Sequence, residues 1–403
     1  MTQKLIDAPA IKLIIDVLER YNGDTRLVGG CVRDAVIGRK TTDIDLATTL
    51  VPQAVLAAFA KHNIKAIPTG LKHGTITAVV SGTTYEVTTL RRDNGCDGRH
   101  ASVVFTDNWM EDASRRDFTF NALYCDKHGK IYDYFCGIQD LRDRRVAFIG
   151  DAATRINEDF LRILRVFRFH ASICSDKALE RDIVSVCGRY AKNLSLLSKE
   201  RIRSEFFKLL SCANCAGTMT TMQQCGVLAQ IIPTIYHIDL TPLHSKHLAC
   251  RHPITKLAAI LKSTKSPEIG QFVDHLSALF RLSRKEKKLL EIFLSTDLNL
   301  PLSTAQQQKY MNEFGVETYI DLLIINFLKS HGIQENMLLQ HIEKTACFKP
   351  IRMPITGKDL TEIGFREGKL VGKTLEALKA VWESDPQNTT KAQLITLAKS
   401  LLG

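Results

Sequence analysis

Apolar and polar residues repeat in two different ways along this chain. Between Thr25 and Leu90, short β-rich runs are separated by glycine, proline and asparagine, and Ser81-Gly82 is typical of a hairpin turn. The predicted strands cover residues 26–28, 42–47, 75–80 and 83–90. From about Arg155 onward, nearly every segment has apolar residues at helical spacing, with breaks near prolines. The pattern predicts an α+β fold, with an N-terminal head that contains a small mixed sheet and a long all-α remainder.

The charge balance is basic. The chain has 54 Lys and Arg against 43 Asp and Glu, a formal net charge of +11. Such a surplus favours polyanionic partners such as nucleic acid, and a solvated basic surface is the alternative. Hydrophobic residues make up 45% and charged residues 24% of the 403 residues, which disfavours wholesale disorder and a collagen-like chain. At about 150 residues per domain, the length predicts roughly two to three domains.

The N-terminal segment and the cysteines indicate a cytoplasmic protein. Lys12, Asp16 and Glu19 interrupt the first apolar runs, so neither a secretory signal peptide nor an organelle transit peptide is expected. No apolar stretch approaches the roughly 18 residues of a membrane helix, and no membrane association is expected. The eleven cysteines are scattered, as reduced thiols are. Cys212 and Cys215 form a Cys-x-x-Cys pair, but no second pair completes a zinc site, so their role stays open.

A pair of aspartates is the first chemical signal. Two glycines, Gly29 and Gly30, follow a predicted strand and precede a short helix, where backbone N–H groups can approach an anion. Asp43 and Asp45 come next, and residues two apart in a strand project from the same face. Two neighbouring carboxylates repel each other unless a cation lies between them, and oxygen ligands suit Mg²⁺. The alternative is a strand end with two solvated acids. Glu86, on a later strand, is a candidate third carboxylate.

Arginines supply the second signal. Arg116 lies near the polar face of its segment, where it would neutralise triphosphate charge unless it is only paired with a nearby aspartate. Four further charged residues recur every three positions, a spacing that makes each a neighbour of the next on a helix: Asp159, Arg162, Arg165 and Arg168. A solvated face held by Asp–Arg pairs is one interpretation.

The base-pairing chemistry of aspartate and arginine supports another interpretation. Aspartate only accepts hydrogen bonds and arginine only donates them. Together they complement the N4–N3 edge of cytosine and the N6–N1 edge of adenine, whereas guanine and uracil present the reverse order. One Asp–Arg pair therefore selects C and A without a template, provided that this helix borders the carboxylate site.

These segments together resemble the class II CCA-adding enzymes, the tRNA nucleotidyltransferases of the DNA polymerase β-like superfamily that also contains bacterial poly(A) polymerases. Five motifs occur in order over roughly residues 26–210: Gly29-Gly30-x2-Arg33-Asp34 with Asp43-x-Asp45, Arg115-Arg116-Asp117 to Asn121, Asp133 to Leu141, Glu158-Asp159-x2-Arg162, and Ser198-Lys199-Glu200-Arg201 to Glu205. The resemblance implies a catalytic nucleotidyltransferase head at 1–145, a helical neck for nucleotide selection at 146–210, and a tRNA-binding helical body and tail at 211–403.

The resemblance also implies a role for each site residue. Asp43 and Asp45 would be catalytic and hold Mg²⁺. Gly30, Arg33 and Arg116 would contact the incoming triphosphate. The base would pair with Asp159 and Arg162, and Arg165 and Arg168 would support that pocket. A segment similar to the flexible loop of the family contains Arg92, Asp93, Asp97, Gly98 and Arg99, and its presence favours addition of the complete CCA.

The expected function is Mg²⁺-dependent addition of C, C and A to the 3′ end of tRNA from CTP and ATP, with pyrophosphate release. The partners would be the 3′ end, acceptor arm and T arm of tRNA, with no stable protein partner. Three alternatives remain: a poly(A) polymerase, an enzyme that adds only CC or only A, and a tRNA-binding protein with an inactive site. The intact Asp43 and Asp45 pair counts against the last of these.

Overall fold

The computed structural model describes residues 5–41, 43–94, 102–232, 238–262, 268–330, 333–348, 353–365, 368–384 and 389–401. The chain forms two compact units. The first comprises Met1–Lys265 and Gln271–Ser283, and the second comprises Ser266–Gly270 and Arg284–Gly403. The predicted boundaries at 145 and 210 fall inside the first unit, and they stay a prediction.

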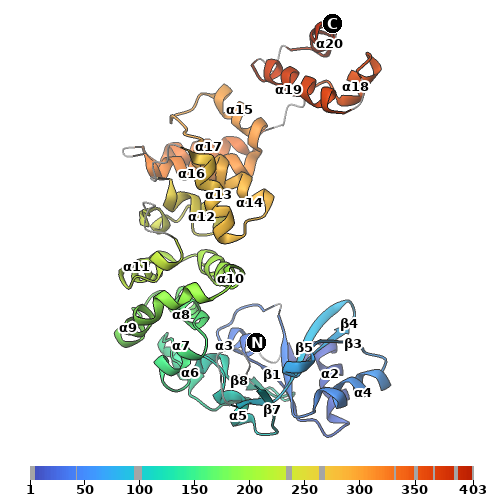
Figure 1. Cartoon of the computed structure of the whole chain (residues 1–403), viewed down its shortest axis with the longest axis vertical. Helices are drawn as coiled ribbons and strands as arrows, with labels where there is room; N and C mark the ends of the chain where they lie inside the picture. Colours follow the sequence, from blue (N-terminus) through green and yellow to red (C-terminus); the bar gives the residue numbers. More distant parts are fainter. Residues whose placement is uncertain are drawn as a thin grey trace. The chain divides into compact units, whose positions relative to one another are not determined.

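The N-terminal part of the first unit contains a mixed sheet of seven strands in the order β3-β4-β5-β2-β1-β8-β9 (Figure 1). Its strands are β1 (Thr25–Val28), β2 (Asp45–Thr48), β3 (Lys65–Gly70), β4 (Thr75–Val80), β5 (Thr83–Thr89), β8 (Leu123–Cys125) and β9 (Ile131–Asp133). The pairing of β2 with β5 is parallel, and the other neighbours are antiparallel. A separate two-stranded ribbon joins β6 (Arg91–Asn94) to β7 (Ser102–Phe105). The predicted α+β class with a small mixed sheet is confirmed.

The four strands predicted from the alternation correspond to β1, β2, β4 and β5. The predicted hairpin turn between β4 and β5 is present as well. Ser81 and Gly82 both have positive φ, 51° and 79°, which suits the right-handed twist of a two-residue hairpin. Strand β3 was not predicted, because this edge strand exposes most of its residues and contains Pro68, so no buried alternation marks it. Strands β8 and β9 were not predicted, because each has only three residues.

The core of the head surrounds an arginine. Arg26 on β1 is 8% exposed, and its guanidinium lies 4.0 Å from the Trp109 ring centroid and 3.9 Å from that of Tyr132. Asp24 accepts hydrogen bonds from this guanidinium and from the Trp109 indole. The helices of the head are α2 (Pro9–Glu19), α3 (Gly30–Val36), α4 (Pro52–Lys61) and α5 (Trp109–Ser114). Apolar burial and a shielded cation–π sandwich therefore fix the strand that leads into Gly29.

Helices account for the rest of the first unit. They are α6 (Gly137–Asp143), α7 (Ala152–Glu158), α8 (Leu161–Ile173), α9 (Arg181–Tyr190), α10 (Lys199–Leu210), α11 (Ala216–Gln224), α12 (Pro253–Leu261) and α13 (Ile269–Phe280). Helix α8 is central, because it packs against α7, α10 and α11. The motif segment 133–141 ends β9 and starts α6, and the Asp133 carboxylate accepts from the backbone N–H groups of Gly137 and Ile138.

Among the described residues of the second unit, all regular secondary structure is helical. Its helices are α14 (Arg284–Ser295), α15 (Thr304–Phe314), α16 (Val316–Lys329), α17 (Glu335–Thr345), α18 (Gly357–Glu362), α19 (Lys369–Ser384) and α20 (Lys391–Ser400). The last three share a small core around Leu360, Leu378 and Trp382. Thr356 and Asp359 form a capping box at the start of α18, which satisfies backbone N–H groups at that end of the helix.

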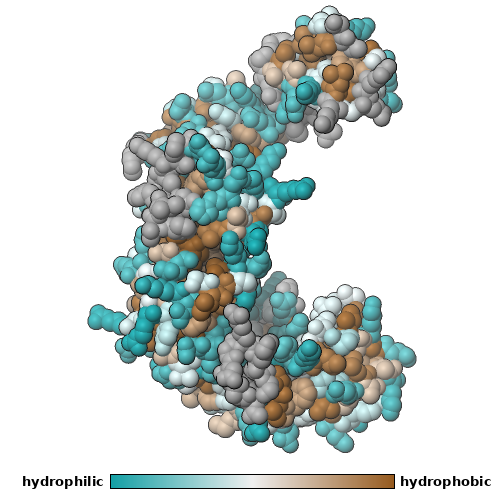
Figure 2. Space-filling model, viewed as in Figure 1, coloured by the Kyte–Doolittle hydropathy of each residue, from teal (hydrophilic) through white to brown (hydrophobic). Residues whose placement is uncertain are grey.

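Surface and cysteine features agree with the composition. The exposed large apolar side chains are spread over separate elements, and the face in Figure 2 mixes hydrophilic with hydrophobic residues. Within the described ranges, no helix is long and apolar enough to cross a membrane. The ten described cysteines are free thiols, including Cys212 and Cys215.

Candidate active site

A polar cavity of about 530 Å³ lies where the head sheet meets α8. Its lining comes from the turn after β1, from α3, from the loop before β2 and the first residue of β2, from the segment after α5, and from α8. The lining residues are Gly29, Gly30, Arg33, Asp34, Lys40, Thr41, Asp43, Asp45, Arg116, Asp117, Asn121, Arg165, Arg168 and Phe169. The structure therefore brings together seven of the predicted site residues: Gly30, Arg33, Asp43, Asp45, Arg116, Arg165 and Arg168.

The carboxylates of the cavity come from the start of β2. Asp45 is the first residue of this strand, and Asp43 precedes it as an exposed residue outside the strand, so the prediction that both lie within one strand is wrong. Asp45 is directly opposite Glu86 of β5 in the parallel register. Burial raises the pKa of Asp45, and the neighbouring charges of Glu86 and Asp43 raise it further. Three negative charges thus gather at this point of the sheet, and a cation would relieve their repulsion.

The donor set fits a divalent cation. Asp43 and Asp45 both face the cavity, and hard oxygen ligands of this kind suit ions that complete their shell with water and phosphate. In the described part of the chain, no group of three or more His, Cys, Asp and Glu side chains is arranged to hold a metal ion, so Glu86 does not complete a three-ligand cluster. Glu86 is exposed and does not line the cavity.

Backbone geometry opens the opposite wall of the cavity. Gly29 has φ 72° and ψ −124°, a conformation that only glycine adopts readily, and its N–H donates to Leu123 O at 2.9 Å. The turn aims α3 so that Arg33 faces the cavity. The Arg33 guanidinium donates to Asp34 at 2.9 Å and to Asn121 Oδ1 at 2.7 Å. These contacts hold a cationic group in place before any ligand arrives.

Arg116 is both a cavity residue and a partner of Asp112. The buried Asp112 carboxylate accepts from Arg116 Nη2 at 3.0 Å, from Arg115 Nη2 at 2.7 Å and from the Tyr124 hydroxyl at 2.8 Å. Burial by itself would raise the pKa of Asp112, but Arg116 and Arg115 outweigh it and lower the pKa to about 2. Arg116 therefore forms the aspartate pair that was the alternative interpretation, and it also lines the cavity. The ion pair orients its guanidinium.

Two arginines of α8 close the cavity from the helical side. Arg165 Nε donates to Asp117 at 2.5 Å, and Arg168 forms an ion pair with Glu205 of α10 at 2.6 Å. The Arg168 guanidinium also lies 3.9 Å from the Phe169 ring centroid. Arg165 lowers the pKa of Asp117 against the raising effect of burial. Each arginine thus pairs with a different element, and neither belongs to a solvated face of Asp–Arg neighbours.

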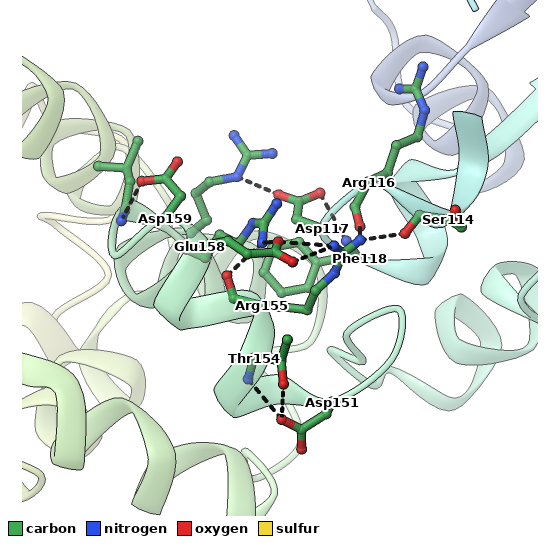
Figure 3. A network of polar contacts seen from close by, with 12 residues as sticks. Ser114, Arg116, Asp117, Phe118, Asp151, Thr154, Arg155, Glu158 and Asp159 are labelled. Carbon is green, nitrogen blue, oxygen red and sulfur yellow. Dashed lines mark hydrogen bonds and ion pairs between the residues drawn. The ribbon is translucent and has the colours of Figure 1, made fainter. Parts of the chain in front are cut away.

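Asp159 and Arg162 lie outside the cavity lining. Asp159 follows the end of α7, so the four charged residues do not share one helix as the spacing suggested. Arg201 of α10 donates to Asp159 at 2.7 Å, and Glu158 accepts from Arg162. In Figure 3, Asp159 and Glu158 lie at the junction of α7 and α8, where Glu158 accepts from Arg155 and Asp159 accepts from the backbone N–H of Leu161.

The loop prediction is only partly covered by the structure. Arg92 lies in β6 and lines a separate cavity with Phe105 and Glu111. The backbone of Asp93 belongs to the same strand. Asp97, Gly98 and Arg99 lie outside the described residues.

Several residues that line or support the cavity were assigned no site role from the sequence: Asp34, Lys40, Thr41, Asp112, Asp117, Asn121 and Phe169. Asp117 and Asn121 stand in a quoted motif, and a rule that each buried arginine needs an acceptor would have singled them out. Asn121 Nδ2 donates to Asp117 at 3.0 Å, which joins the anchors of Arg33 and Arg165. Phe169 carries no such signal, because its spacing is that of an ordinary core residue.

The chain resembles known nucleotidyltransferases in both sequence and fold. Residues 25–147 match the family model described as poly A polymerase head domain, and residues 178–238 match the probable RNA- and SrmB-binding site of polymerase A. The chain is 32% identical to the Danio rerio mitochondrial CCA tRNA nucleotidyltransferase 1 over 96% of this chain and 90% of that protein. It is 28% identical to the Lactobacillus helveticus CCA-adding enzyme over 91% and 90% of the two chains.

Solved structures give the same answer. The crystal structure of the Bacillus stearothermophilus CCA-adding enzyme in complex with CTP superposes with a TM-score of 0.72 at 26% identity, over 96% of this chain and 97% of that one. A Thermotoga maritima CCA-adding enzyme complexed with tRNA shares the fold, with a TM-score of 0.61 at 19% identity over 99% and 98% of the two chains. Because the chain is 32% identical to a CCA tRNA nucleotidyltransferase over 96% of its length, it belongs to the family of CCA-adding enzymes, the CCA tRNA nucleotidyltransferases, whose chemistry depends on a divalent metal cation.

Proposed function

We propose that this chain adds C, C and A to the 3′ end of tRNA, using CTP and ATP and releasing pyrophosphate. One observation carries the proposal: two carboxylates, Asp43 and Asp45, share a single cavity with Arg33 and Arg116. Carboxylates for a cation and arginines for phosphates are what phosphoryl chemistry needs at one place. Relatives of matching length that are named for this activity support the assignment.

Asp43 and Asp45 are the proposed ligands of Mg²⁺. When bound, the ion would lower the pKa of the terminal 3′-hydroxyl and stabilise the charge of the departing pyrophosphate. Arg33 and Arg116 would bind the triphosphate, and both are already oriented, by Asn121 and Asp112 respectively. The backbone at Gly30 would let the phosphates approach closely. Pre-oriented cations need little reorganisation when charge develops, which is the main electrostatic source of rate enhancement.

Nucleotide selection would fall to Asp159 and Arg162. The carboxylate accepts from the exocyclic amino group of C or A, and the guanidinium donates to the adjacent ring nitrogen. Asp159 keeps unused lone pairs after accepting from Arg201 and from the backbone N–H of Leu161, because a carboxylate accepts about four hydrogen bonds. Arg165 and Arg168 would support the pocket from α8.

The remaining assignments follow from charge and organisation. The net charge of +11 suits tRNA phosphates, and the acceptor and T arms would be held through backbone and shape, not sequence. The proposed organisation is a head at 1–145, a neck at 146–210, and a body and tail at 211–403. Free thiols at the described cysteines support a reducing compartment, and we place the protein in the cytoplasm.

The proposal is tested with purified protein, Mg²⁺ and three tRNA transcripts that end before CCA, after C and after CC. Each transcript is offered labelled CTP, ATP, GTP or UTP. Ordered addition of C, C and one A is expected, with loss of at least about a thousandfold in Asp43→Ala and Asp45→Ala. Asp7→Ala, an exposed aspartate that does not line the cavity, is the matched control and should retain activity.

The other outcomes separate the alternatives. Long A tails would identify a poly(A) polymerase. Addition that stops at CC, or that starts only after CC, would identify a partial enzyme. No incorporation with any nucleotide would contradict the proposal and leave a tRNA-binding protein.

A further inference from the structure

We infer that Arg155 is a positioning residue that ties the head segment carrying Arg116 to Arg162, and that it thereby sets nucleotide discrimination. The inference rests on the proposed function, because it assigns Arg162 to the base. Arg155 lies on α7, lines no cavity described above, and has a side chain that is only 12% exposed. A long cationic side chain is rarely so enclosed without a specific set of partners.

The first half of the link reaches the head. Arg155 Nη2 donates to the backbone carbonyl oxygens of Ser114 and Arg116, the latter at 2.7 Å. Ser114 is the last residue of α5 and Arg116 lies in the turn that follows, where its side chain lines the cavity. Figure 3 shows the Arg155 side chain reaching from α7 to this turn. The backbone that carries a phosphate-binding arginine is therefore held by a residue of a different helix.

The second half of the link reaches Arg162. Arg155 Nη1 donates to both Glu158 oxygens, at 3.1 and 2.9 Å. The same carboxylate accepts from Arg162 Nη1, which also donates to the backbone carbonyl oxygen of Arg155 at 2.5 Å. Glu158 is thus shared between two guanidinium groups, and the direction of the Arg162 side chain depends on where Arg155 holds this carboxylate.

Only arginine fits this arrangement. Its two terminal nitrogens point to two separate partners, the head carbonyls and Glu158, which a single ammonium group cannot span. Among the described residues, Arg155 Nε is buried without a hydrogen-bond partner, so the hydrogen bonds of this side chain all come from its two Nη groups. The start of α7 is fixed independently, because the Asp151 carboxylate accepts from Thr154 N at 2.7 Å. Replacement of Arg155 should therefore move the Arg162 guanidinium without unfolding α7.

The experiment measures binding and turnover of all four nucleotides in Arg155→Lys, which keeps the charge but loses the fork. We expect the preference for CTP over UTP to fall about 10- to 100-fold, the loss typical of one charge-assisted hydrogen bond to a charged group. Glu158→Gln, which removes the shared charge and keeps the shape, should act in the same direction. Arg145→Lys is the matched control, since Arg145 also pairs with a glutamate, Glu180, at 2.5 Å but contacts neither arginine of the site.

A double-mutant cycle separates positioning from a purely structural role. In an Arg162→Ala background, Arg155→Lys should cost no further discrimination, because the group that it positions is gone. Equal loss with all four nucleotides, or undiminished loss in that background, would overturn the inference. Equilibrium binding of CTP and UTP needs no turnover, so a wild-type protein that binds selectively but transfers nothing would contradict the proposed function alone. Wild-type protein that binds the four nucleotides equally would overturn the inference itself.

Discussion

The ion cluster behind Arg116 makes the replacement Asp112→Asn a sharp test of the site. The Asp112 carboxylate is 1% exposed and accepts from two arginines and a tyrosine. Its pKa is lowered from 3.8 to about 2, which at about 1.4 kcal/mol per tenfold change in the ionisation constant amounts to roughly 2 kcal/mol in favour of the charged form. We therefore expect the variant to lose about 2–3 kcal/mol of head stability at pH 7.

The pH dependence supplies the sign of the effect. A carboxyl whose pKa is lowered on folding adds stability above its unfolded pKa of 3.8, and this contribution is lost as pH falls toward about 2. The difference in unfolding free energy between wild type and Asp112→Asn should therefore be complete at pH 6–7 and shrink steadily below about pH 4. Nucleotide transfer should also fall at pH 7, because Arg116 loses its anchor.

Urea unfolding followed by tryptophan fluorescence reads the head directly. The chain has two tryptophans, and Trp109 lies in the head with its ring centroid 5.0 Å from that of Tyr124, the hydroxyl donor to Asp112. Using Trp382→Phe as the common background confines the signal to Trp109. Asp7→Asn, at an exposed ion pair with Lys12, is the control and should change stability by less than about 0.5 kcal/mol. A loss below about 0.5 kcal/mol in Asp112→Asn, or a loss independent of pH, would refute the reasoning.

Three further predictions concern the backbone and the core. Gly29→Ala should destabilise the head by about 1–3 kcal/mol and lower nucleotide affinity, because alanine is strained at φ 72° even though its Cβ meets no clash. Calorimetry and nucleotide titration measure the two effects, and an unchanged melting temperature would contradict the prediction. Arg26→Met should lower the free energy of unfolding by about 2 kcal/mol, because it removes a guanidinium that lies over the Trp109 and Tyr132 rings. Trp109 fluorescence in urea measures this loss, and a loss near zero would mean that only burial of the methylenes matters. Lys256→Met should destabilise the first unit by about 2 kcal/mol, because the ammonium group donates at 2.8 Å to two backbone carbonyl oxygens that would lose their partner. Thermal unfolding tests this prediction, and equal or higher stability of the variant would refute it.

Much of the head could be predicted from local pattern. Alternation predicted β4 and β5 with their turn, and the Gly-Gly step with the two aspartates indicated the cavity beside the end of β1 and the start of β2. These features depend on residues close together in the chain, where side-chain periodicity and turn chemistry act directly. The prediction that Asp43 lies within the strand was wrong, because the strand begins only at Asp45. Periodicity does not fix the ends of elements.

The acceptors of the arginines could not be predicted in the same way. Their spacing suggested neighbours on one helix, yet Arg165 pairs with Asp117, 48 residues away, and Arg168 with Glu205 of α10.

By itself, the sequence determined the fold class, the paired carboxylates and the basic charge, because each follows from composition or short-range spacing. Only the tertiary structure decided which acid orients which arginine and that Arg155 joins Arg116 to Glu158. The physical reason is that a buried charge must find a partner in space, and the packing of α7, α8 and α10, not chain distance, determines which partner is within reach.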